Sequence, residues 1–169
     1  MRFTVRDYRR EDFDTLWAID QSCFPPGISY SQYELRSYLR RPDAFTLVAE
    51  SAAEPAAEPT EGPEQRGHEI LGFLVAESSR KVGHITTIDV RSEARRHRIG
   101  SALLDIAESR LSAANCRSVR LETAVDNISA LAFYKRRGFD VIKTIPRYYS
   151  NHVDALLLEK DLHSPVSSS

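Results

Sequence analysis

Cysteine is scarce in this chain. The 169 residues include only Cys23 and Cys116, too few for the disulfide framework that holds small secreted domains together. No apolar run approaches the ~20 residues of a membrane helix, and no apolar segment leads the chain. We therefore expect a cytoplasmic protein with no membrane partner, in which both thiols are reduced and packed.

An excess of charge of one sign is also lacking. The chain has 23 Lys and Arg residues against 24 Asp and Glu residues, which leaves a net charge of −1 at pH 7. This balance argues against general affinity for nucleic acid, so any binding of phosphate should be local. We expect neither a nucleic-acid partner nor a bound metal.

Large apolar side chains are absent from residues 51–67, which are rich in Ala, Glu and Pro. This stretch cannot bury enough surface to offset its chain entropy. We expect a mobile insertion at the tip of a hairpin, with a docking role as the alternative. The whole chain is 41% hydrophobic, enough for a single domain over residues 1–160, followed by a disordered tail over 161–169.

The spacing of apolar residues predicts the order of the remaining segments. The expected strands are 3–6, 45–49, 70–75, 85–90, 118–125, 139–145 and 153–158. The expected helices are 13–23, 32–40, 99–111 and one from 127 or 129 to 137. Ser31 and Glu34 form a capping box at the start of the second helix. The resulting order is β-α-α-β-β-β-α-β-α-β-β.

A basic turn joins the strand at 85–90 to the helix that begins at Ile99. The turn contains the run ArgArgHisArgIleGly, residues 95–100. A helix N-terminus offers unpaired N–H groups and a partial positive charge, and the cations of the turn lie at the same place. The arrangement predicts a site for a phosphate-bearing ligand, and a plain solvated loop is the alternative.

Two motifs resemble those of the GNAT (GCN5-related) N-acetyltransferase superfamily. The pattern Asn-x-x-Ala-x-x-Phe/Leu-Tyr-x-x-x-Gly-Phe of its second acyl-CoA motif is matched by Asn127, Ala130, Phe133, Tyr134, Gly138 and Phe139. Its pyrophosphate loop, Arg/Gln-x-x-Gly-x-Gly/Ala after a strand, is similar to residues 95–100. Within the superfamily, the chain most resembles the RimI-type ribosomal-protein alanine N-terminal acetyltransferases.

The resemblance implies a fold, a co-substrate and the residues that bind it. The implied fold is an α/β (α+β) GNAT domain, a mixed twisted sheet of about seven strands flanked by about four helices. The implied co-substrate is acetyl-CoA, with no metal. The residues expected to bind it are Ile88, Asp89, Val90, Arg95, Arg96, His97, Arg98, Ile99, Gly100, Ser101, Asn127, Phe133 and Tyr134.

Arg98 departs from the family pattern because it stands where the loop has its first glycine. Either the turn avoids a positive φ at this residue, or the turn carries a cost of roughly 1–2 kcal/mol. The departure bears on the affinity for the coenzyme and leaves the binding mode unchanged.

Glu122 and Tyr134 are the candidate catalytic residues. Attack of an amine on a thioester releases a thiolate, which a positioned phenol can protonate, and the amine must lose a proton to a base. RimI-type enzymes have a Glu and a Tyr at the matching positions, which implies that Glu122 is the base and Tyr134 the acid. The alternatives are an ion-paired surface role for Glu122 and a core packing role for Tyr134.

The acceptor amine is indicated by two further resemblances to protein N-terminal acetyltransferases. Phe24 and Pro25 resemble the loop that receives the first residues of a peptide, which Tyr30 or Tyr33 could also line, and Tyr148 and Tyr149 resemble a tyrosine pair that holds the substrate backbone. We expect a protein N-terminus as acceptor, with ribosomal proteins among the candidates, and a monomer or weak dimer. The alternatives are a small amine or a lysine side chain as acceptor, and a non-catalytic module that binds acetyl-CoA.

Overall fold

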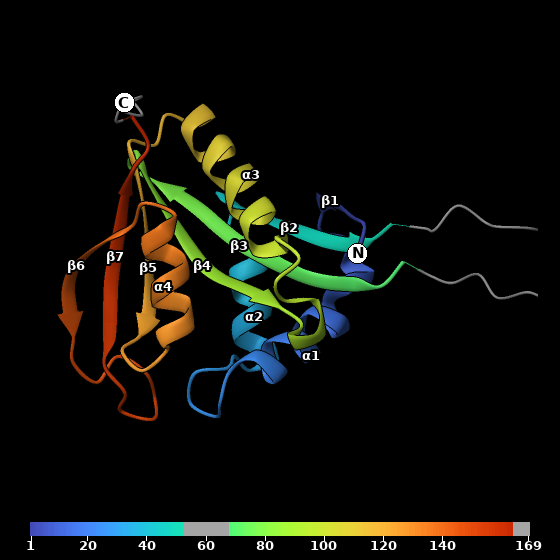
Figure 1. Ribbon diagram of the computed structural model, residues 1–169, viewed down its shortest axis with the longest axis horizontal. Coiled ribbons are helices and arrows are strands. Elements are labelled where there is room, and N and C mark those ends of the chain that lie inside the picture. The colour runs from blue at the N-terminus through green and yellow to red at the C-terminus, as the bar shows by residue number, and fades with distance from the viewer. Residues whose placement is uncertain (53–67, 164–169) are drawn as a thin grey trace, which may run out of the picture.

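The computed structural model describes residues 1–52 and 68–163, which form one twisted seven-stranded sheet with helices on both faces (Figure 1). The strand order is β1-β2-β3-β4-β5-β7-β6. The strands are β1 (Phe3–Asp7), β2 (Ala44–Ser51), β3 (Ile70–Ser79), β4 (Val82–Val90), β5 (Ser118–Ala124), β6 (Asp140–Ile145) and β7 (Ala155–Asp161). The helices are α1 (Phe13–Cys23), α2 (Gln32–Leu39), α3 (Ile99–Ala113) and α4 (Ile128–Arg136). Short 3-10 turns lie at Arg10–Asp12 and Ser92–Ala94.

The predicted fold class and the predicted order of segments are confirmed. The strands β3 and β4 are longer than predicted because they form one hairpin. Its turn consists of Arg80 and Lys81, with φ values of 49° and 67°, and Gly or Asn usually marks such a turn in a sequence. Most of the predicted insertion at 51–67, and residues 164–169 of the predicted tail, lie outside the described residues.

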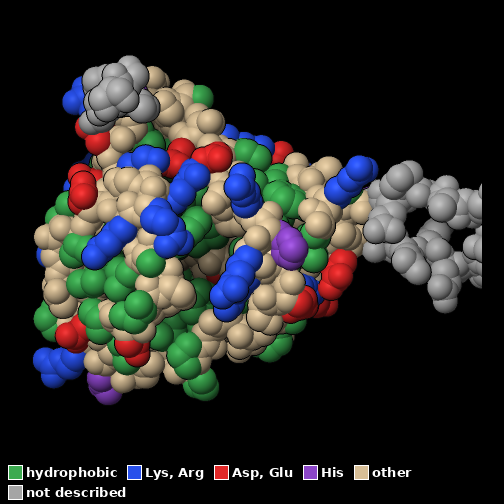
Figure 2. All heavy atoms as spheres, viewed as in Figure 1, with side chains coloured by type: hydrophobic (Ala, Val, Ile, Leu, Met, Phe, Trp, Pro, Cys, Tyr) green, Lys and Arg blue, Asp and Glu red, His purple; other side chains and the backbone are tan. Residues whose placement is uncertain are grey.

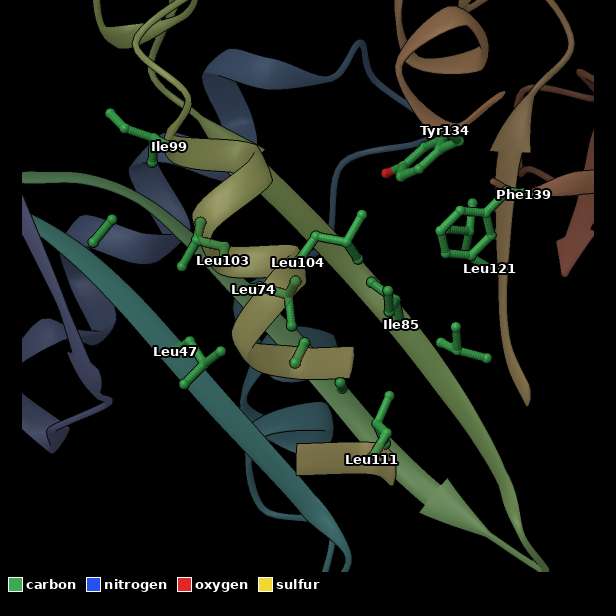
Figure 3. Packing of buried hydrophobic residues seen from close by; sticks show 14 of the residues in the cluster. Leu47, Leu74, Ile85, Ile99, Leu103, Leu104, Leu111, Leu121, Tyr134 and Phe139 are labelled. Atoms are coloured by element: carbon green, nitrogen blue, oxygen red, sulfur yellow. The ribbon is translucent and has the colours of Figure 1, made fainter. Parts of the chain in front are cut away.

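Each face of the sheet has its own hydrophobic core. On one face α3 and α4 pack on the central strands, and the buried side chains include Leu103, Leu104 and Tyr134 (Figure 3). On the other face α1 and α2 bury Leu16, Ile19 and Leu35 against β2 and β3. The helix α3 buries one face because its buried residues recur at spacings of three or four, with Leu103 and Leu104 adjacent. In the part of the chain that the structure describes, no helix is long and apolar enough to cross a membrane.

A β-bulge in β4 decides which side chains face each core. Val75 is paired with Thr87 and Ala76 with Ile85, which leaves Thr86 as an extra residue. Ile85 therefore packs in the α3 core, whereas Asp89 contacts Asp20 of α1 on the opposite face. Without the extra residue, the alternation of a regular strand would place both side chains on the same face.

The parallel pairing of β4 with β5 is short. It joins only residues 82–84 to residues 118–120. Beyond this point β4 remains paired with β3 through Val90, and β5 remains paired with β7 along its whole length. The two ribbons diverge from the point where they pair (Figure 1). We refer to the opening between residues 85–90 and 121–124 as the β4–β5 split.

We expect Gly72→Ala in β3 to destabilise the fold. A Cβ atom at this position would lie 2.5 Å from the main-chain oxygen of Asp89 and 3.2 Å from Cα of Val90, so β3 and β4 would have to separate. Overpacking of this kind costs about 1–3 kcal/mol. The free energy of unfolding in urea measures the loss.

Gly100→Ala is the matched control for Gly72→Ala. Its added Cβ would lie 3.6 Å from Cζ of Phe133, an ordinary contact, and Ala favours a helix over Gly by about 1 kcal/mol. This variant should be as stable as the wild type or more so. Equal losses in both variants would show that the close approach at Gly72 does not limit stability.

Candidate active site

The turn before α3 presents free N–H groups at one end of the β4–β5 split. The first N–H to bond within the helix is that of Ala102, which donates to the carbonyl of Arg98 over 3.0 Å. The N–H groups of residues 99–101 therefore point out of the helix end, where an anion can accept them. Figure 2 shows Lys and Arg side chains on the face that includes α3 and α4.

The turn adopts the left-handed conformation at two arginines. Arg96 has φ = 67° and Arg98 has φ = 61°, so the second of the two alternatives for Arg98 holds and the turn carries the steric cost of a side chain. Ile99, which is 1% exposed, fixes the start of α3 in the core. Ser101 follows in the first turn, half-buried.

Arg95 and Cys23 both contact the end of β4. The Nε of Arg95 donates to the carbonyl of Val90 over 3.2 Å, and the thiol of Cys23 donates to the same oxygen over 3.4 Å. A terminal nitrogen of Arg95 lies 3.8 Å from Sγ of Cys23. The side chains of Arg96, His97 and Arg98 are exposed. Of the four basic side chains at residues 95–98, Arg95 is thus the one that bonds to β4.

The helix α4 places Phe133 and Tyr134 beside the turn and the split. The Oδ1 atom of Asn127 caps the helix by accepting from the N–H of Ala130. Phe133 lies 3.6 Å from the position of a Cβ on Gly100, which brings the two predicted coenzyme motifs together. Tyr134 is 7% exposed and makes edge contacts with Phe133 and Phe139.

The hydroxyl of Tyr134 has the properties of a proton donor. Figure 3 shows it pointing from α4 toward the side of β4. Burial is the main cause that raises its pKa above the usual value, and the charge of Asp89 adds to the effect. A raised pKa keeps the phenol protonated at neutral pH, so Tyr134 holds a proton that it can donate, and it also makes the phenol a weaker acid toward a departing thiolate.

Glu122 lies on the opposite face of the sheet from Tyr134, paired with a histidine that the sequence analysis did not single out. Nε2 of His84 lies 2.6 Å from Oε2 of Glu122, and Nδ1 of His84 lies 3.9 Å from Glu77. Arg41 in turn donates to Glu77 over 2.6 Å. The side chains of His84 and Glu122 are 34% and 19% exposed. Glu122 therefore has a close partner in His84, and its carboxylate also borders the split.

The predicted acceptor residues Tyr30, Tyr148 and Tyr149 lie close together on the Glu122 side. The rings of Tyr148 and Tyr149 make an edge contact at 4.9 Å, and the charge of Glu122 contributes to the raised pKa of each. Tyr30 stacks edge-on with Tyr38 at 5.0 Å. Burial, the largest cause, also raises the pKa of Tyr30, to which the neighbouring Tyr38 and Tyr148 contribute.

Two loops are joined over this side of the site. The carbonyl of Gly27 accepts from the N–H of Ser150 over 3.2 Å and from its hydroxyl over 2.9 Å. These bonds tie the α1–α2 loop to the β6–β7 loop. Phe24 ends α1, and the carbonyl of Pro25 accepts from two N–H groups of the turn that follows. The predicted loop thus has a defined conformation that holds Gly27 against Ser150.

Tyr149 lies near enough to both Tyr134 and Glu122 for electrostatic coupling. Burial is the main cause that raises the pKa of Tyr134 and of Tyr149; Tyr149 is a further cause for Tyr134, and the charge of Glu122 is a further cause for Tyr149. The split is therefore bordered by a phenol on one side and a carboxylate on the other. Among the described residues, no group of three or more His, Cys, Asp or Glu side chains could hold a metal ion.

A model of the acetyltransferase (GNAT) family matches residues 13–139, well over half of the chain. The chain belongs to the GNAT acetyltransferase family. The predicted family is therefore confirmed, and the predicted enzyme class, an acetyl-CoA-dependent acetyltransferase, agrees with it.

Relatives of known sequence include protein N-terminal acetyltransferases. An N-alpha-acetyltransferase of Sulfurisphaera tokodaii is 29% identical over 95% of this chain and 93% of its own length. Human N-alpha-acetyltransferase 30 is 34% identical over 78% of this chain and 40% of its own. An uncharacterised N-acetyltransferase of Methanocaldococcus jannaschii is 36% identical over 54% of this chain and 59% of its own. The chain thus spans about half the length of the last two relatives.

Solved structures share the fold. Ard1 from Thermoplasma volcanium has a TM-score of 0.79 at 26% identity, covering 95% of this chain and 98% of its own. The NatC complex bound to Gag peptide and CoA has a chain with a TM-score of 0.74 at 25% identity, covering 95% of this chain and 99% of its own. The ribosomal-protein-S18-alanine N-acetyltransferase of Escherichia coli has a TM-score of 0.74 at 17% identity, covering 99% of each chain, a likeness of fold alone.

We expect Arg98→Gly to stabilise the protein. Glycine removes the left-handed cost of about 1–2 kcal/mol but loses about 0.5–1 kcal/mol of backbone entropy on folding. The free energy of unfolding should therefore rise by about 0.5–1 kcal/mol, measured by denaturant titration.

Arg98→Ala is the control because it removes the same guanidinium but keeps the Cβ atom and its strain. Its stability should stay near that of the wild type, and equal gains in both variants would contradict the strain argument.

If the Arg98 side chain also contacts a phosphate, Arg98→Ala should weaken acetyl-CoA binding more at low salt than at high salt.

Proposed function

We propose that this protein transfers the acetyl group of acetyl-CoA to the α-amino group of a protein N-terminus by direct attack. The observation that carries the proposal is the β4–β5 split, with Tyr134 on one side, Glu122 on the other and the N–H groups of residues 99–101 at its end. An extended thioester and an amine can meet in such an opening from opposite faces of the sheet.

The coenzyme side is proposed to use main-chain groups. Residues 85–90 keep an edge that is free of β5, and the amides of an extended pantetheine can pair with it as a strand would. The pyrophosphate is assigned to the N–H groups of residues 99–101. Asp89 can contribute there only through its main chain because its side chain is buried against α1. Ile88, Val90 and Phe133 offer partly buried apolar surface beside the split.

The proposed chemistry needs one acid and one base. Acetyl-CoA, when bound, supplies an activated acetyl group whose sulfur leaves as a thiolate. Tyr134 donates its phenolic proton to that sulfur, and Glu122 accepts the proton that the attacking amine loses, directly or through a water. An α-amino group with a pKa of about 7.7–8.0 is mostly ammonium at neutral pH, so the base is needed. His84, bonded to Glu122, can take part in passing that proton to solvent.

A protein N-terminus is the proposed acceptor for two reasons. Relatives that match most of this chain's length are N-alpha-acetyltransferases. The two bonds between Gly27 and Ser150 hold the α1–α2 and β6–β7 loops together over the acceptor side. A peptide that enters end-on needs less room between these loops than one that presents a lysine from the middle of its chain. The cytoplasm remains the proposed compartment because Cys23 and Cys116 are free thiols.

Incubation with acetyl-CoA and a library of peptides that differ in their first residues tests the proposal. We expect acetyl transfer to free N-termini and none to the same peptides with blocked N-termini. Transfer only to lysine side chains, polyamines or aminoglycosides would assign another acceptor. Acetyl-CoA binding without turnover on any amine would indicate a non-catalytic module.

Tyr134→Phe should lower kcat by about 10²–10⁴ because it removes the proton donor but keeps the buried ring. Acetyl-CoA affinity, measured by calorimetry, should change little. Tyr8→Phe is the matched control, since Tyr8 lies half-buried beside Asp12, outside the β4–β5 split. Full turnover in Tyr134→Phe would remove this residue from the chemistry.

Glu122→Gln should lower the rate most below the pKa of the acceptor amine. As pH rises, the amine arrives deprotonated and no longer needs the base, so the deficit should shrink. A pH–rate profile from about pH 7 to about pH 9.5 measures it, with the exposed Glu11→Gln as control. An equal deficit at every pH in a folded variant would assign Glu122 to the His84 ion pair alone.

A further inference from the structure

Two buried carboxyl groups lie in contact between α1 and β4. Asp20 is 0% exposed and Asp89 is 1% exposed, and their side chains are within hydrogen-bonding range of each other. The bulge at Thr86 is what turns Asp89 toward α1. Carboxyl groups are rarely buried at this depth without a counter-ion, so the pair needs a physical account.

The hydrogen bonds of the pair leave one oxygen of each group without a donor. Oδ2 of Asp20 accepts from the N–H of Tyr30 over 2.7 Å and from Nε2 of Gln21 over 3.2 Å. Oδ1 of Asp89 accepts from the hydroxyl of Thr87 over 2.5 Å. Oδ1 of Asp20 and Oδ2 of Asp89 are buried and receive no hydrogen from any other described group. A single proton between the two carboxyl groups satisfies both oxygens and removes one of two buried like charges.

The surroundings favour retention of this proton. Burial raises the pKa of Asp89 well above its usual value, and the charge of Asp20 raises it further. Burial is also the main cause that raises the pKa of Asp20. The neighbouring titratable or charged groups are Cys23 of α1, Tyr30 of the α1–α2 loop, Glu34 of α2, Arg95 of the turn before α3 and Tyr134 of α4. Arg95 is the cation among them, and its guanidinium is exposed and bonded to Val90.

The pair holds the segment that carries Tyr30. The N–H of Tyr30 donates to Asp20, and its carbonyl accepts from the indole of Trp17 over 3.0 Å and from Gln21 over 2.7 Å. Its hydroxyl donates to the carbonyl of Thr86 over 3.1 Å. Asp20, through Asp89, is therefore one connection between this segment and β4, and the hydroxyl of Tyr30 is another.

We propose that Asp20 and Asp89 are positioning residues that hold one proton between them and that this proton fastens the Tyr30 segment to β4. At alkaline pH the shared O–H bond breaks and the proton passes to solvent base, with no other covalent change. Two buried carboxylates then repel each other and the Tyr30 segment detaches. The consequence for acceptor binding rests on the proposed function, whereas the structural change does not.

Trp17 reports the structural change directly. The chain contains one Trp, and its indole bonds to the carbonyl of Tyr30. We expect the fluorescence of the wild type to show a reversible transition above the ordinary titration range of Asp and below the range in which exposed Tyr residues ionise. Asp89→Asn should abolish the transition, because its amide donates permanently to Asp20 while its oxygen still accepts from Thr87.

Two further variants guard this result. Asp20→Asn should abolish the transition for the same reason, which keeps the test available if Asp89→Asn does not fold. Cys23 is another titratable group beside Asp89, so Cys23→Ser tests whether the thiol causes the transition. We expect this variant to retain it. A transition that survives in both Asn variants, or none in the wild type, would overturn the proposal.

Stability gives a second readout that needs no substrate. An unfolded Asp has a pKa of about 3.9, whereas the folded pair retains its proton to higher pH. The folded state therefore binds more protons, and the wild-type free energy of unfolding falls as pH rises from the unfolded to the folded pKa. Asp89→Asn should be stabilised relative to the wild type across that window. A difference that does not depend on pH would contradict the shared proton.

Steady-state kinetics with an N-terminal peptide then test the functional consequence. Above the pH at which the proton leaves, the ratio of wild-type KM to Asp89→Asn KM should rise about tenfold per pH unit, since only the fastened form binds acceptor. Acetyl-CoA affinity should follow the same pH profile in both proteins. A fluorescence transition without a change in this ratio would refute a role in acceptor binding. A protein with no acetyl transfer at all would refute the proposed function and leave the fluorescence result valid.

Discussion

The end of parallel pairing between β4 and β5 after His84 is the constraint on which the rest of the site depends. Each strand keeps a full partner on its other side, β3 for β4 and β7 for β5, so the sheet opens without falling apart. Main-chain N–H and C=O groups that lose a strand partner need another one. An edge of this kind is suited to a ligand with amide groups in an extended chain, and the free end of α3 adds an anion site beside it.

The fold could be predicted from the sequence, but the contacts that complete the site could not. Apolar spacing located α1 and α3, capping residues located α2 and α4, and the run from Asn127 to Phe139 located the second motif, because these signals are local. The His84–Glu122 pair spans 38 positions and depends on which strands are neighbours and in what register. The Arg80–Lys81 turn was missed because neither residue is among those that commonly adopt a positive φ.

Asp89 shows how a residue of an expected motif can border the split with its main chain while its side chain faces elsewhere. The resemblance placed it with the coenzyme residues, and its main chain does border the β4–β5 split. A single extra residue at Thr86 reverses the alternation, so its carboxyl group faces α1 and Asp20. Side-chain direction in a strand depends on every bulge that precedes it, and a single sequence carries no clear signal for a bulge formed by two adjacent threonines.

The shared proton bears on both halves of the proposed reaction. Asp20 fastens Tyr30 on the acceptor side, and the charge of Asp89 raises the pKa of Tyr134 on the coenzyme side. A second negative charge on the Asp20–Asp89 pair would loosen the Tyr30 segment. It would also raise the pKa of Tyr134 further, because like charge disfavours a phenolate. A phenol with a higher pKa is a weaker acid toward a departing thiolate. A single proton buried beneath β4 would thus keep the acceptor segment in place and hold the proposed acid at a strength that can serve the reaction.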